Sequence, residues 1–165
     1  MKIAQNIFLY IVFIICVVLL FVGGPRTGTS SSALHIWDLG HIFLFALGSY
    51  ILIKDLPFLS RQHFFTQLLV IFTLSLLLGI ISEYIQVKFH RTPDVGDLGR
   101  DILGGLIAVA FLSPQRKHTS IFSLRLVQII LVILFLYQLL PLSEALAKQM
   151  KIFPETLVEK TESPV

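Results

Sequence analysis

The segment FFTQLLVIFTLSLLLGIIS, from Phe64 to Ser82, has 19 residues and no charged side chain. At about 1.5 Å of rise per residue, a helix of this length nearly crosses the hydrocarbon core of a membrane, which is roughly 30 Å thick. The helical pattern continues into the sequence EYIQ, which begins at Glu83 and carries the first charge. The segment therefore predicts a transmembrane helix with polar side chains at its end.

The composition of the whole chain also indicates a membrane protein. Of the 165 residues, 55% are hydrophobic and 14% are charged, against about 25% charged residues in an average soluble domain. These values exclude a soluble cytosolic enzyme and a disordered chain, and the single cysteine, Cys16, excludes a disulfide scaffold. The 13 lysines and arginines are scattered around the hydrophobic runs, so we also exclude a nucleic-acid-binding protein.

Four more apolar runs have about the length of a membrane span, at residues 3–25, 33–53, 94–112 and 126–143. The predicted fold class is all-α: a polytopic membrane protein with a bundle of about five transmembrane helices in residues 1–143. Residues 144–165 are expected to form a short interfacial helix and, from Pro154, a flexible tail, because the tail is charged and rich in turn formers. Thr92 is the expected N-cap of the fourth span, with Pro93 in its first turn.

The orientation in the membrane follows from the number of spans and from the first helix. Five spans place the N-terminus and residues 54–63 and 113–120 on one side. Lysines and arginines are almost equally divided between the two sides, but the first helix usually weighs most. We therefore expect a multi-pass protein of the cell membrane with a cytoplasmic N-terminus. The start of the second span, the end of the third and the start of the fourth then face outward.

Ionisable side chains are costly in a membrane and need partners, so their positions carry most of the functional information in this chain. Three groups each occupy one face of a predicted helix: Asp38 and His41, then Glu83, Gln86 and His90, then Asp97 and Asp101. Arg91 and Arg100 are the cations nearest to them. Because all three groups lie on the same side of the membrane, we expect them to form one polar cluster.

The stretch from Glu83 to Gly104 resembles a known family. It reads Glu83-x-x-Gln86 and then Arg91-x-x-Asp94-x-x-Asp97-x-x-x-Asp101-x-x-Gly104, which is similar to the E-x-x-Q and R-x-x-D-x-x-D-x-x-x-N-x-x-G pattern of VanZ-like membrane proteins. Asp101 stands where the family tends to have asparagine, and Asp38 lies three residues before His41, where the family has Asp-Lys four residues before its histidine. The resemblance implies a cell-envelope protein linked to resistance to glycopeptides such as teicoplanin, and it implies no particular reaction.

Two interpretations of the polar cluster remain open. In one, it is a network of hydrogen bonds and ion pairs that fixes the register of the helices. In the other, it is an extracytoplasmic site for a wall or lipid-linked component, with Glu83 or His41 as general base and Arg91 holding an anionic group. The substrate-binding residues of such a site would be Asp38, Gln86, Arg91, Asp94, Asp97 and Asp101.

A divalent cation is a further option for the same residues. Carboxylates suit Mg²⁺ or Mn²⁺, and histidine with carboxylates suits Zn²⁺, but no H-E-x-x-H or comparable spacing supports a metal. Two other functions remain: a small proton-coupled transporter, in which the acids would form a relay, and a non-catalytic partner in membrane assembly. His35 has no evident partner and is expected at the surface, and Ser82 is expected to be a packing residue.

Overall fold

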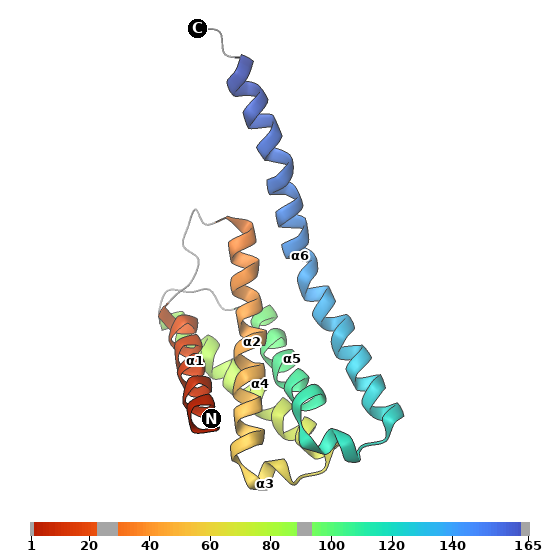
Figure 1. Cartoon of the computed structure of the whole chain (residues 1–165). Coiled ribbons are helices and arrows are strands. Elements are labelled where there is room, and N and C mark those ends of the chain that lie inside the picture. Colours follow the sequence, from red (N-terminus) through yellow and green to blue (C-terminus); the bar gives the residue numbers. More distant parts are fainter. Residues whose placement is uncertain (1, 23–29, 89–93, 163–165) are drawn as a thin grey trace.

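The computed structural model describes the backbone of residues 2–22, 30–88 and 94–162 and the side chains of residues 6–21, 30–88 and 94–150. Every regular element in this part of the chain is a helix (Figure 1), which confirms the predicted all-α fold. The helices are α1 (Lys2–Val22), α2 (Ser31–Asp55), α3 (Pro57–Ser60), α4 (Phe64–Lys88), α5 (Val95–Leu112), the 3₁₀ helix η1 (Pro114–His118) and α6 (Ile121–Glu162).

Within the described residues, three helices are long and apolar enough to cross a membrane: α2, α4 and the Ile121–Met150 part of α6. The apolar part of α1, Asn6–Phe21, is shorter. Helix α5 has 18 residues, and three of them are charged: Asp97, Arg100 and Asp101. The chain is thus a helical membrane protein in which α5 carries three charged residues and buries two of them, Asp97 and Asp101.

Helix α5 packs against α2 on one side and α4 on the other, with α6 also in contact with it. Small residues allow this close approach. A Cβ atom at Gly104 would overlap the backbone carbonyl of Ile42 in α2, and a Cβ at Gly105 would overlap the Ser75 hydroxyl of α4. Ala108 is completely buried one turn further along. Backbone proximity at these small residues therefore fixes the position of α5.

Successive long helices run in opposite directions. Helix α1 is antiparallel to α2, because the Tyr10 hydroxyl donates to Asp55 (2.5 Å) and Lys54 donates to Asn6 (2.5 Å), which joins the start of α1 to the end of α2. The start of α2, the end of α4 and the start of α5 consequently lie toward one end of the bundle (Figure 1). We call this the site end.

At the opposite end of the bundle, buried polar side chains are paired. The amide nitrogen of Gln67 donates to the carbonyl of Leu59 (2.8 Å), and its oxygen accepts from the Ser113 hydroxyl (2.5 Å). Gln115 donates from its backbone N–H to the Ser113 hydroxyl oxygen (3.1 Å) and from its side chain to the Ser60 carbonyl (2.9 Å). This network joins α3, α4 and η1, and it leaves neither end of the Gln67 amide without a partner.

Helix α6 differs from the predicted fifth span. The sequence predicted an end at Ser143, a separate short helix and a flexible tail from Pro154, whereas the structure has a single helix that continues to Glu162. The Ser143 hydroxyl donates back to the Leu140 carbonyl (2.8 Å), so it does not cap a new helix. The following residues, EALAKQM, are mostly strong helix formers, which explains why the helix has no break.

Candidate functional site

A buried histidine lies at the centre of the polar cluster. His41 on α2 is 1% exposed, and its ring lies against two carboxylates of α5. Its Nδ1 is 2.9 Å from an Asp101 oxygen, and its Nε2 is 3.4 Å from an Asp97 oxygen. The two aspartates are four residues apart on a helix and therefore share a face, as the sequence analysis expected. The structure brings these three predicted site residues together.

The two contacts of His41 are not equivalent. Nδ1 forms a hydrogen bond with Asp101, but Nε2 has no hydrogen-bond partner in the described part of the chain, although Asp97 is near. When the Nδ1–H donates to Asp101, the Nε2 of a neutral imidazole is an acceptor that faces a second acceptor. The position between Nε2 and Asp97 therefore favours a donor group from a bound molecule.

Arg100 is the cation that holds the acids of the cluster. Its guanidinium bonds to Asp97, lies 3.4 Å from an oxygen of Asp94 and lies 3.8 Å from an oxygen of Asp38. Its Nε also donates to Gln138 of α6 (3.4 Å). From the sequence, Arg91 and Arg100 were both expected to pair with these acids, and the structure shows this pairing for Arg100. The signal for its role was its position three residues after Asp97, which places both side chains on one face of α5.

The start of α5 differs from the predicted one. Asp94, not Thr92, is the N-cap: its side chain accepts from the backbone N–H of Gly96 (2.8 Å), and the helix begins one residue after Asp94. A carboxylate is a better N-cap than a threonine hydroxyl, and its charge also suits a helix N-terminus. Thr92 lies outside the described residues, as do Arg91 and His90, so their predicted roles remain predictions.

Helix α4 contributes Glu83 and Gln86 to the cluster. One oxygen of Glu83 accepts from the backbone N–H of Asp94 (2.9 Å), which joins the end of α4 to the start of α5. The other oxygen of Glu83 is buried and has no hydrogen-bond partner among the described residues. Gln86 is 2% exposed, and no residue between 30 and 88 or between 94 and 150 accepts a hydrogen bond from its amide nitrogen. Gln86 is therefore buried in the site, and half-buried Glu83 places one oxygen beside it.

Within the part of the chain that the structure describes, four buried polar atoms of this cluster have no hydrogen-bond partner: Nε2 of His41, Oε1 of Glu83, Nε2 of Gln86 and Oδ2 of Asp101. Each such atom costs about 1–3 kcal/mol of stability, and native proteins contain few of them. At the opposite end of the same bundle, both the nitrogen and the oxygen of the Gln67 amide have hydrogen-bond partners. A cluster that served only to hold helices together would be expected to resemble that network.

Asp38 lies at the rim of the cluster. Its side chain is 30% exposed and reaches the other acids through Arg100. An oxygen of Asp38 is also 3.5 Å from Nδ1 of His35, one helical turn earlier. The prediction that His35 has no partner is therefore wrong, because the i, i+3 spacing on α2 brings these two side chains together.

The cluster has a clear excess of acids. Among the described residues, one arginine, Arg100, and two histidines, His35 and His41, contact the five acids Asp38, Glu83, Asp94, Asp97 and Asp101 or lie within the same cluster. In the part of the chain that the structure describes, no three His, Cys, Asp or Glu side chains are arranged to hold a metal ion. The excess of acids favours a cationic or hydrogen-bond-donating group as their complement.

Comparison with models of protein families, with curated proteins and with solved structures finds no match to this chain. The fold and the cluster define a class in physical terms: a helical membrane protein with a buried acid–histidine–arginine cluster toward one end of the bundle.

Proposed function

We propose that this chain is a VanZ-like protein of the cell envelope, in which the polar cluster is a working site for a wall or lipid-linked component. The motif from Glu83 to Gly104 supports the family. The observation that carries the site is the group of four unpaired buried polar atoms around His41. An incoming molecule with hydrogen-bond donors would satisfy the acceptors among them, whereas a purely structural cluster gains nothing from leaving them unpaired.

The proposed topology is a five-span bundle with the N-terminus in the cytoplasm. Helices α2, α4 and α6 have the length and apolar character of spans, and α5 lies packed between α2 and α4, so it crosses the membrane with them. Helix α1 runs antiparallel to α2 and completes the bundle. In this arrangement, the polar cluster opens toward the extracytoplasmic side.

Cysteine labelling tests this topology. In a Cys16→Ser background, we expect an impermeant thiol reagent to label Lys88→Cys in intact cells, because Lys88 ends α4 at the site end. Lys117→Cys, in η1 at the opposite end, should be labelled only after the cells are opened; both lysines are exposed. The reverse pattern would place the cluster in the cytoplasm and contradict an outer-leaflet site.

The chemistry that suits the cluster is proton transfer to or from a hydroxyl or amine of the bound molecule. Asp101 accepts from Nδ1 of His41, which holds the ring and leaves Nε2 as the free base. Asp97 lies beside Nε2 and stabilises the positive charge that the ring gains with a proton. Arg100 is already shared by three acids and positions Asp97. Glu83 is the second base of the proposed site.

Two acid-to-amide variants test this function. Glu83→Gln and Asp97→Asn keep the shape of each side chain and remove its charge. We expect both proteins to accumulate in the membrane at about the wild-type level and to lose all of the teicoplanin tolerance that the wild-type chain confers on a deletion strain. Asp55→Asn, an acid-to-amide change at the opposite end, is the control and should retain tolerance. Full tolerance in both cluster variants at matched protein levels would contradict the proposed site and support a purely structural role for the cluster.

A further inference from the structure

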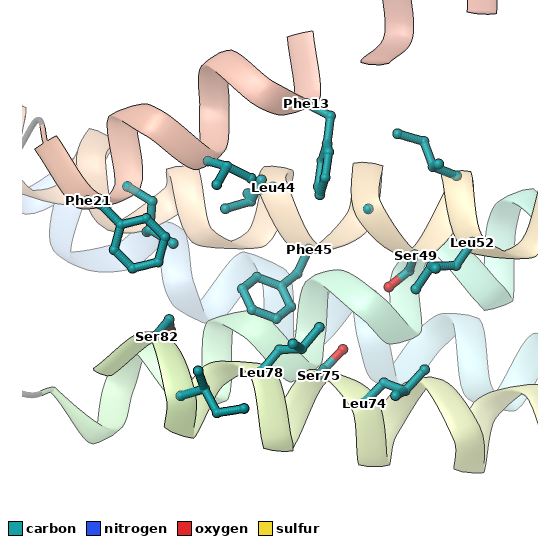
Figure 2. A pocket seen from close by; sticks show the side chains of 15 residues that line it. Phe13, Phe21, Leu44, Phe45, Ser49, Leu52, Leu74, Ser75, Leu78 and Ser82 are labelled. Carbon is teal, nitrogen blue, oxygen red and sulfur yellow. The ribbon is translucent and has the colours of Figure 1, made fainter. Parts of the chain in front are cut away.

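A cavity of about 350 Å³ lies between α1, α2 and α4, and its volume falls in the range of ligand-binding pockets. Figure 2 shows Phe13 and Phe21 of α1 on one side of it, Phe45 of α2 beside it, and Leu78 and Ser82 of α4 on the other side. Helix α1 packs mainly on α2. Because α1 and α4 flank α2 at this level, their side chains leave a space between the two helices.

The lining of this cavity suits a hydrocarbon chain. It consists almost wholly of aliphatic and aromatic side chains, with three serines as its polar members. One of these, Ser82, donates its hydroxyl to the Gly79 carbonyl of its own helix (2.8 Å) and is therefore already paired. Leu78 and Ile81 also line the cavity and are about half exposed, so the cavity reaches the lipid-facing surface of the bundle.

One end of the cavity lies next to the polar cluster. On α4, Ser82 lines the cavity and the next residue, Glu83, belongs to the cluster. On α2, Leu44 and Phe45 line the cavity one helical turn after His41. An apolar cavity that ends beside buried acids fits an amphipathic molecule better than a wholly apolar or wholly polar one.

We infer that the cavity holds an acyl chain of a membrane lipid whose ammonium headgroup lies in the polar cluster. The charge balance selects the headgroup, since the five acids outnumber the single arginine and the two histidines, His35 and His41, that the described residues supply to the cluster. An ammonium group also supplies the hydrogen-bond donors that Glu83 and Asp101 lack. This assignment rests on the proposed function, because it takes the polar cluster to be a binding site. It adds the chemical class of the molecule that the cluster binds.

Lipid binding to the purified full chain tests the acyl-chain part of this inference. Dioleoyl phosphatidylethanolamine is titrated into the detergent-solubilised protein, and the bound fraction is measured by native mass spectrometry. We expect Leu78→Trp, which fills the mouth of the cavity, to weaken binding at least tenfold. Leu77→Trp is the matched control, because Leu77 is similarly exposed on the same helix and does not line the cavity. Equal affinities for these two variants would overturn the cavity as the binding site.

The headgroup part has its own readout. Dioleoyl phosphatidylglycerol has the same chains without an ammonium group, so the wild-type chain should bind it at least tenfold more weakly, and Glu83→Gln should reduce that preference. A wild-type chain that binds both lipids equally would overturn the assignment of the headgroup to the cluster. Lipid binding that follows these expectations, together with full teicoplanin tolerance in Glu83→Gln and Asp97→Asn, would contradict the proposed function and leave the lipid site standing.

Discussion

Arg100→Ala is expected to lower the free energy of unfolding by about 3–5 kcal/mol, because it leaves buried carboxylates without their cation. The Arg100 side chain is 16% exposed and lies against Asp97, Asp94 and Asp38. Of these, Asp97 is the most deeply buried, so the loss of its cation costs the most stability. A loss of this size approaches the whole stability of many domains, so most of the variant should be missing from the membrane.

The measurement is membrane accumulation by immunoblot, together with thermal unfolding in detergent followed by size exclusion. Arg61→Ala is the control, since Arg61 is an exposed arginine at the opposite end of the bundle and should behave like the wild type. Arg100→Lys should be intermediate, because lysine restores the charge but not the planar fork that reaches several carboxylates at once. Equal accumulation of Arg100→Ala and Arg61→Ala would show that the acids do not depend on this cation.

The second large effect is expected at Gly104. A Cβ at this position would overlap the backbone of Ile42, and backbone atoms cannot move aside as the end of a flexible side chain can. Gly104→Ala should therefore force α5 away from α2 and destabilise the fold by about 1–3 kcal/mol, although alanine is the better helix former. Separation of these helices would also pull Asp97 and Asp101 away from His41, so the variant should lose function together with stability.

Gly99→Ala provides a matched control on the same helix. Nothing lies within 4 Å of the Cβ that this substitution would add. It should be neutral or slightly stabilising, because alanine in a helix is favoured over glycine by about 1 kcal/mol. Thermal unfolding of both variants in detergent measures the difference. An unfolding temperature for Gly104→Ala at or above that of Gly99→Ala would contradict the close packing of α5 on α2.

The sequence was most informative where geometry is local. Spacings of three and four residues predicted that Asp97 and Asp101 share a face, as Glu83 and Gln86 do, and these spacings need only the helical repeat. The alternation of helix directions then predicted that the start of α2 lies at the same end as the start of α5. The contact of His41 with Asp97 and Asp101 follows from both, together with the glycines that bring α2 and α5 together.

The N-cap of α5 and the end of the fifth span were harder to predict, because more than one residue or hydrogen bond suits each position. Thr92 and Asp94 are both good capping residues, and the helix uses Asp94, whose backbone N–H is also bound by Glu83. Ser143 can cap a helix or bond to the preceding turn, and it does the second. The cavity beside Ser82 had no signal in the sequence, because it depends on where α1 lies against α2 rather than on the pattern of any one segment.

The polar character of α5 has a consequence for the biogenesis of the protein. In the proposed topology, α5 enters the membrane with Asp97, Arg100 and Asp101 in its first half, and each charge placed near the middle of an isolated span opposes insertion by about 2.5–3.5 kcal/mol. Helices α2 and α4 leave the ribosome first. They supply His41 and Glu83 as polar partners, and their residues Ile42 and Ser75 pack against Gly104 and Gly105 of α5. Insertion of α5 is therefore coupled to assembly of the bundle, and the residues of the proposed site are also the ones that the nascent chain must pair before it becomes a stable membrane protein.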